Sequence, residues 1–151
     1  MRHAIAAVLI AILPACAAAQ QTAILPVKLL DTSHEVRDQQ TDHDRRLALL
    51  ADTIAAEAGE ASIIDRDRLA SCTPETTECL LALARDDGAE RALFIVAQKT
   101  STLILQLFAN LVDTGSGELI VSRNLTFRGD TDDSWRRAGR FLARQMDAAA
   151  E

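Results

Sequence analysis

The chain has no tyrosine and few aromatic residues of any kind, with one tryptophan and four phenylalanines among 151 residues. Proteins that bind single-stranded nucleic acid stack bases on such side chains, so their scarcity argues against that class. Basic residues are also in the minority, 16 against 22 acidic ones. Phosphate backbones and anionic membrane surfaces attract basic proteins. The composition therefore predicts no nucleic-acid partner.

Long apolar runs are missing too. The longest one, Ala4–Leu13, is shorter than the roughly 20 residues that span a bilayer. It follows the basic Arg2 and precedes small residues, which is the three-part pattern of a secretory signal peptide. Ala17–Ala19 supplies an A-x-A cleavage site. We therefore expect residues 1–19 to be removed, leaving residues 20–151 as one domain without a transmembrane segment.

Cys16 allows an alternative to cleavage after Ala19. Leu13–Cys16 loosely resembles a lipoprotein cleavage box, which would leave Cys16 as a lipidated N-terminus. Pro14 directly before the small residue suits that box poorly, whereas a proline about five residues before a soluble-type cleavage site is usual. We expect a soluble exported domain, and the alternative is a lipoprotein anchored through Cys16.

Cysteine is rare, with three residues in the chain and two, Cys72 and Cys79, after cleavage. An even pair in an exported chain favours a disulfide, and the six residues between them can form the turn that a bridge needs. The alternative is a zinc site completed by His34 or His43. Zinc sites usually have a tighter C-x₂₋₄-C spacing and a second ligand pair, which this chain lacks.

Hydrophobic periodicity predicts the secondary structure. Strands are expected at 23–30, 61–64, 92–97, 102–112 and 118–127, with Pro26 at an edge or irregular position. The polar stretch 31–42 is expected to be a solvent-facing loop. The first helix is expected to be capped by Thr41 or Asp42 and to end at Gly59, and the second to cover 75–87 with Pro74 in its first turn. A third helix is expected after a cap at Asp130 or Thr131. Its predicted inner residues are Trp135, Ala138, Leu142 and Met146.

The predicted order is thus β-α-β-α-β-β-β-α. Two right-handed crossovers would make the first three strands parallel, and two hairpins would make the fourth antiparallel to its neighbours. We therefore predict a single α/β domain with a mixed five-stranded sheet and helices on its faces.

No catalytic set stands out. His34 and His43 lie near Ser33, Asp31, Asp42 and Asp44, but in a polar loop without a nucleophile elbow, so solvated residues and helix caps are the expected roles. Asp130, Asp132 and Asp133 lack the calcium-loop frame, and capping explains them. The sequence therefore predicts no enzyme, no metal and no cofactor.

The tryptophan and the arginines of the last predicted helix could be structural or could bind a partner. Trp135, near Lys99 and Arg128, is expected to pack in the core, with a binding-site anchor as the alternative. Arg136, Arg140 and Arg144 form a stripe that is either a solvated face or a docking surface for an acidic partner.

Four stretches carry a family resemblance: Leu29–Ser33, Gly88–Leu105, Asp113–Gly115 and Arg128–Trp135. Together they resemble a family of exported proteobacterial proteins of unknown function with K-x-S-x-L-I-L and R-G-[ND]-T-D-[ED]-S-W motifs. Asp130 stands where that family commonly has asparagine, and the two cysteines are more widely spaced than the family's close pair. The element order also resembles the amino-terminal domain of TolB and several envelope assembly factors.

The resemblance implies a non-enzymatic periplasmic accessory protein or interaction module, whose partner is an envelope protein of unknown identity. The alternative is a periplasmic small-ligand binder with its site where the first and third strands end. The candidate interaction or ligand surface consists of Asp31, Thr32, Ser33, Lys99, Ser101, Arg128, Asp130 and Trp135.

Overall fold

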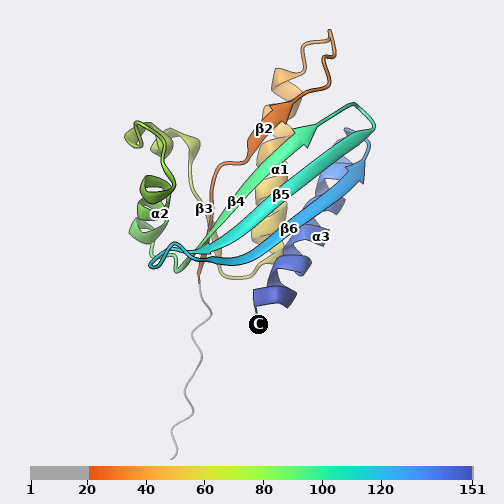
Figure 1. Cartoon of the computed structure of the whole chain (residues 1–151). Coiled ribbons are helices and arrows are strands. Elements are labelled where there is room, and N and C mark those ends of the chain that lie inside the picture. Colours follow the sequence, from red (N-terminus) through yellow and green to blue (C-terminus); the bar gives the residue numbers. More distant parts are fainter. Residues whose placement is uncertain (1–20, 151) are drawn as a thin grey trace, which may run out of the picture.

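In a computed structural model of the protein, residues 21–150 are described. The signal peptide predicted at 1–19 and the alternative anchor Cys16 lie outside the described residues. The elements, shown in Figure 1, are β1 (Thr22–Ile24), β2 (Lys28–Asp31), α1 (Gln40–Glu57), β3 (Ala61–Ile63), the 3₁₀ helix η1 (Arg66–Ser71), α2 (Thr77–Asp86), β4 (Arg91–Lys99), β5 (Ile104–Asp113), β6 (Leu119–Arg128) and α3 (Asp132–Ala150).

The strands form one mixed sheet in the order β3-β1-β4-β5-β6, with β2 paired to β4. β1 is parallel to β3 and β4, β2 is parallel to β4, and β5 is antiparallel to both neighbours. The predicted class, a single α/β domain with a mixed sheet, is confirmed. The predicted strand over 23–30 is divided in two around Pro26, which has no amide hydrogen for the ladder.

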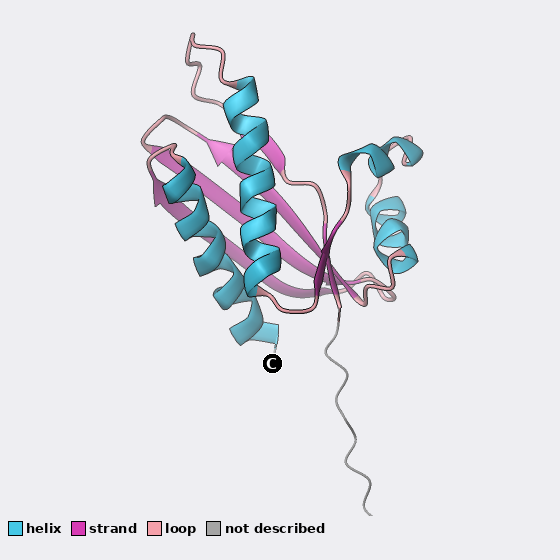
Figure 2. Ribbon diagram, turned by 180° about the vertical axis from the view of Figure 1, so that it is seen from behind, coloured by secondary structure: helices cyan, strands magenta, loops and turns pink. Residues whose placement is uncertain are grey.

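Two helices cover one face of the sheet. α1 and α3 lie side by side across it, as Figure 2 shows from behind. The predicted inner residues of α3 are all buried, and so are Leu47, Leu50, Ala51 and Ile54 of α1. At Gly139 the helices approach so closely that an added Cβ would lie 3.1 Å from Thr53 Cγ2. The opposite face is covered by α2 only at one end (Figure 1), which leaves Phe108 and Ile104 exposed.

Some boundaries differ from the prediction. The loop predicted over 31–42 is shorter, because α1 begins at Gln40. The residue before this helix is Gln39, whose side chain makes no capping hydrogen bond. The prediction that Thr41 or Asp42 caps α1 was therefore wrong. Pro74 lies before α2 after a cis peptide bond, and Thr76 caps that helix. The cap of α3 is Thr131, whose Oγ1 accepts from the Ser134 amide at 3.3 Å.

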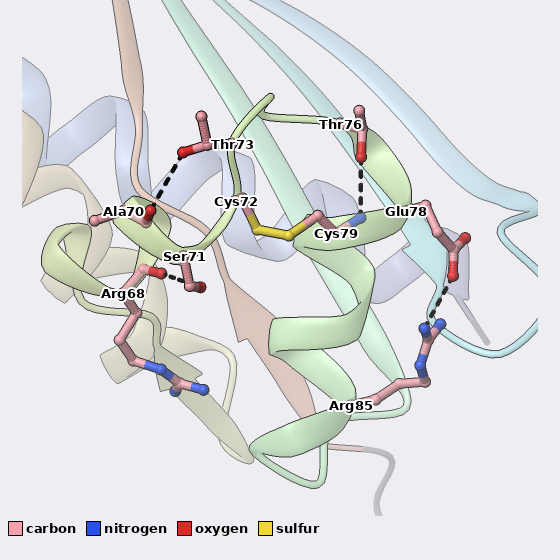
Figure 3. Close-up of a disulfide and its surroundings, with 9 residues drawn as sticks. All are labelled: Arg68, Ala70, Ser71, Cys72, Thr73, Thr76, Glu78, Cys79 and Arg85. Atoms are coloured by element: carbon pink, nitrogen blue, oxygen red, sulfur yellow. Dashed lines mark hydrogen bonds and ion pairs between the residues drawn. A yellow bond between two sulfur atoms is a disulfide. The ribbon is translucent and has the colours of Figure 1, made fainter.

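The predicted disulfide joins Cys72, just after η1, to Cys79 in the first turn of α2 (Figure 3). The two Cα atoms lie 5.7 Å apart. Thr76 Oγ1 accepts a hydrogen bond from the Cys79 amide at 3.3 Å, so the cap and the bridge fix the same turn. Because the sulfurs are bonded to each other, they are not thiolates available to zinc.

Candidate functional site

Polar side chains from three distant segments meet at the end of β4. Lys99, the last residue of that strand, is completely buried. Its Nζ lies 3.0 Å from Glu35 Oε2 and 3.1 Å from Asp130 Oδ2, and it donates to Gln39 Oε1 at 2.8 Å. A buried ammonium group is stable only when it is paired and hydrogen-bonded, and here three partners satisfy it.

Asp130, in the turn between β6 and α3, is the anionic centre of this group. Its Oδ1 accepts from Trp135 Nε1 at 2.9 Å and lies 2.8 Å from Arg46 Nη1. Its Oδ2 forms an ion pair with Lys99, although the approach lacks hydrogen-bond geometry. Asp130 therefore joins β4, α1 and α3 through one carboxylate.

His43 completes the group from the first turn of α1. It is buried, with Nε2 3.4 Å from Lys99 Nζ and 3.6 Å from Asp130 Oδ2, and Nδ1 4.0 Å from Asp31 Oδ2. The prediction that His43 is a solvated loop residue was wrong, because α1 starts early enough to turn this position inward. We call Glu35, Gln39, His43, Arg46, Lys99 and Asp130 the Lys99 cluster.

The cluster keeps its central pair ionised. Burial alone would raise the pKa of the Asp130 carboxyl, but the Trp135 hydrogen bond and the neighbouring cations outweigh it, so this pKa lies below its ordinary value. Burial alone would lower the pKa of Lys99, but the hydrogen bond to Glu35 and the ion pair with Asp130 outweigh it and the pKa is raised. Both groups are therefore charged near neutral pH.

The predicted surface residues divide into buried and accessible ones. Lys99 and Trp135 have no exposed area, so they hold the fold together and offer nothing to a partner. Thr32 Oγ1 donates to the Lys99 carbonyl oxygen at 3.1 Å. Ser101 Oγ accepts from the backbone amides of the β4–β5 turn. Arg128 is exposed and lies outside the Lys99 cluster.

Sequence patterns did not identify Glu35 and Gln39 as partners of Lys99, nor Arg46 as a partner of Asp130. A helical signal was present, since Gln39, His43 and Leu47 follow each other at i, i+4 and i+8 and continue the apolar stripe of α1 backwards. A polar stripe on the inner face of a helix predicts buried charged partners. The identity of those partners could not be read, because Lys99 and Asp130 lie far along the chain.

The residues considered for chemistry have structural partners. Ser33 Oγ donates to Asp31 Oδ1 at 2.6 Å, which is not the serine–histidine contact of a hydrolase. The three aspartates considered for calcium contact arginines: Asp130 with Arg46, Asp132 with Arg45 and Arg46, and Asp133 with Arg137. Within residues 21–150, no group of three or more potential ligand residues is placed to hold a metal.

An open groove of about 850 Å³ runs beside β2, next to the Lys99 cluster. β2 forms one wall, α1 the second, and η1 with the segment before α2 the third. A neighbouring hollow of about 550 Å³ shares Pro26, Leu47 and Arg66 with it and extends it toward β3. We call the combined feature the β2 groove; its lining includes Pro26, Val27, Lys28, Leu29, Asp31, Gln39, His43, Leu47, Arg66, Leu69, Ala70 and Glu75.

The groove exposes a strand edge. Among the described strands, β2 pairs with β4 alone, and β3 pairs with β1 alone. The Thr32 amide donates to Lys99 O at 2.8 Å, so this residue faces β4. Because the backbone groups of successive strand residues point to opposite sides, those of Leu29 and Asp31 face the groove.

A smaller cavity of about 340 Å³ lies on the opposite face of the sheet, under α2. Its lining is mostly apolar and includes Leu80 of α2 and Phe94, Val112 and Leu119 of the sheet, together with Lys28 and Glu75. The same two residues form an ion pair that separates this cavity from the β2 groove.

The domain belongs to the α/β class: it has a mixed β-sheet with one face covered by helices and the other face largely open. The chain belongs to the family DUF3280, described as "Protein of unknown function (DUF2380)", which matches residues 20–146. The expectation of a family of unknown function is thus confirmed. No curated protein matches the sequence.

Solved structures share the fold at low identity. The PelC dodecamer from Paraburkholderia phytofirmans is 14% identical, with 87% of this chain and 86% of that chain covered and a TM-score of 0.53. Lipoprotein GNA1162 from Neisseria meningitidis is 12% identical, with coverages of 86% and 99% and a TM-score of 0.53. TolB from Acinetobacter baumannii is 12% identical over 87% of this chain but 28% of that chain, also with a TM-score of 0.53. The predicted likeness to a part of TolB is confirmed at the level of the fold.

Proposed function

We propose that this protein is a non-enzymatic interaction module of the cell envelope, which binds an extended segment of a partner protein in the β2 groove. The observation that carries the proposal is the free outer edge of β2, which lies along one wall of the groove. In Figure 1 β2 lies beside β4 on one side, while α2 stands apart on the other.

Strand addition explains why this edge suits a peptide. An extended segment can pair with backbone groups of an exposed strand edge and place alternate side chains in neighbouring pockets. The groove offers such backbone groups at Leu29 and Asp31 and apolar contacts at Leu47 and Leu69. The Lys99 cluster lies at the end of the groove and fixes β4, and with it β2, against α1.

The similar structures support an envelope role and an assembly role. One is named as a lipoprotein, which supports a place in the envelope, and another as a dodecamer, which supports assembly. A non-enzymatic role is supported by the polar residues themselves, because Asp31, His43 and Lys99 contact one another or the fold rather than a reacting centre. Asp31, an exposed member of the predicted surface, lines the groove and belongs to the proposed site.

We further propose that the protein is exported and begins at Gln20. Intact-mass spectrometry of protein taken from the periplasm should give this start, with a mass lower by two hydrogen atoms before reduction because Cys72 and Cys79 are bridged. A diacylglyceryl group on Cys16 would establish the lipoprotein alternative instead. An uncleaved chain would contradict export through a signal peptide.

A groove-filling substitution tests the site. Ala70 is exposed on η1 and lines the groove, so Ala70→Trp should block the groove without disturbing the core. Affinity capture from the native envelope should recover one reproducible partner with the wild-type chain, and its yield should fall about tenfold with the variant. The matched control is Ala56→Trp, the same change on an exposed position of α1 outside the groove. Equal recovery by the wild type and Ala70→Trp contradicts the proposal.

A second candidate function is the binding of a small apolar ligand in the cavity under α2. Its volume of about 340 Å³ and mostly apolar lining are typical of ligand sites. Trp135 cannot report on it, because that side chain is buried beneath the other face of the sheet. Chemical-shift changes confined to residues such as Phe94 and Leu119, on addition of a fatty acid, would support this function, and their absence across a ligand panel would exclude it.

A further inference from the structure

A second surface lies at the opposite edge of the sheet, between β6 and α3. A shallow hollow of about 590 Å³ is bordered by four arginines, Arg128, Arg137, Arg140 and Arg144. Its floor contains Leu125 and Phe127, and Phe141 stands in it with 44% of its surface exposed. We call this feature the arginine hollow. This local concentration of four positive charges contrasts with the net charge of −6 of the whole chain.

The chain itself neutralises these cations only in part. Arg137 pairs with Asp133, and Arg144 lies 3.9 Å from Glu57, but all four of these side chains are at least one-third exposed, so solvent weakens both pairs. No ion pair within residues 21–150 engages Arg128 or Arg140. The hollow therefore presents an excess of positive charge to solvent.

The hollow also adjoins a free strand edge. β6 is the last strand of the sheet, so its outer backbone groups have no neighbouring strand among the described residues. α3 runs back alongside β6 after the Gly129–Thr131 turn (Figure 2). An added strand would lie about 4.8 Å beyond β6, over the outer side of α3.

The spacing of the arginines is close to the side-chain repeat of such a strand. Arg137, Arg140 and Arg144 occupy successive turns of α3, and one turn rises about 5.4 Å. Side chains on one face of a strand recur every two residues, or about 6.7 Å. Acidic residues at alternate positions of an added strand would therefore face successive arginines, while its backbone pairs with β6.

We propose that the arginine hollow binds an extended, acidic segment of a partner protein, with Asp or Glu at alternate positions, by strand addition to β6. This surface is independent of the β2 groove and lies at the other edge of the sheet. Arginine suits the role because its guanidinium binds carboxylates through two parallel hydrogen bonds.

The probe is a labelled synthetic peptide in which glutamate alternates with threonine, and binding is followed by fluorescence anisotropy. Arg140→Glu should weaken binding at least fivefold, because it reverses one of the four positive charges that border the hollow. The matched control is Arg136→Glu, the same change on an exposed position of α3 outside the hollow, which should weaken binding less than twofold. Raising the salt concentration should weaken binding of the wild type.

Two peptides test the mode of binding without altering the protein. A peptide of the same composition with its glutamates consecutive should bind at least fivefold more weakly than the alternating one. An alternating peptide with methylated backbone nitrogens, which cannot pair with a strand, should not bind. Equal binding of the consecutive or the methylated peptide, or an unchanged affinity of Arg140→Glu, overturns the proposal. So does binding to phosphatidylglycerol vesicles in place of the peptide, which would make the hollow a lipid-contacting surface.

Discussion

Replacing Asp130 by asparagine should destabilise the protein by about 3 kcal/mol near pH 7, the cost of breaking a buried ion pair by removing one partner. The variant keeps the size of the side chain and an acceptor for Trp135 Nε1. It removes the negative charge shared by Lys99, Arg46 and His43, and Lys99 is then left in the interior with Glu35 as its remaining carboxylate. Urea unfolding followed by circular dichroism measures the difference.

The effect should depend on pH with a defined sign. The pKa of Asp130 is lowered in the folded protein, so its contribution is complete above the ordinary value of 3.8 and is lost as the pH falls through the folded value. The pKa of Lys99 is raised, so its contribution is complete below 10.5 and is lost as the pH rises through the folded value. The difference between wild type and Asp130→Asn should therefore be constant from about pH 5 to 9 and shrink as the pH falls below 3.8.

The matched control is Asp133→Asn, the same chemical change three residues along. Asp133 is exposed and pairs with Arg137 on the surface of α3, so its loss should leave the unfolding midpoint nearly unchanged. If Asp130→Asn were as stable as Asp133→Asn at neutral pH, or if its effect did not diminish in acid, the ionised Asp130 would not be the centre of the Lys99 cluster.

Replacing Trp135 by alanine should cost about 3 to 5 kcal/mol, the usual penalty for emptying a large aromatic site in a core. Trp135 is fully buried at the start of α3 and packs edge-on against Phe127, with ring centroids 5.5 Å apart. The substitution also removes the hydrogen bond to Asp130. Thermal unfolding followed by far-ultraviolet circular dichroism is the measurement, because the variant has no tryptophan fluorescence.

Trp135→Phe separates the two contributions. It keeps most of the aromatic volume and removes the indole donor, so it should cost about 1 to 2 kcal/mol. Phe141→Ala is the matched control on the same helix, since Phe141 is 44% exposed and its loss should change stability little. Similar stabilities of Trp135→Ala and Phe141→Ala would show that Trp135 does not anchor α3 to the sheet.

The helices were predictable because their stripes are local. Leu47, Leu50 and Ile54 on α1, and Trp135, Ala138 and Leu142 on α3, repeat at helical spacing and are buried as expected. The alternation along β5 also placed Leu105, Leu107 and Leu111 correctly, whereas Leu103 lies outside the strand and is 68% exposed. Strand ends depend on the neighbouring turns, which hydrophobic periodicity does not encode.

The site was less predictable, because its contacts join residues far apart in the chain. Lys99, Asp130 and Trp135 were predicted to lie on a surface, but the structure buries Lys99 and Trp135 completely and leaves 4% of the Asp130 side chain exposed. Glu35 and Gln39 lie 64 and 60 residues from Lys99 along the chain. The β2 groove exists because Pro26 divides the first strand and β3 ends early, so β2 has no outer neighbour.

The most direct test of the interaction proposal is photo-crosslinking in the native envelope. A photoreactive residue is placed at Arg37 or Ala70, both exposed in the β2 groove, and at Ala56, an exposed control on α1 outside the groove. We predict that the two groove positions give an adduct with the same partner protein and that Ala56 does not. Adducts from Ala56 alone, or none from either groove position, would contradict binding of a partner beside β2.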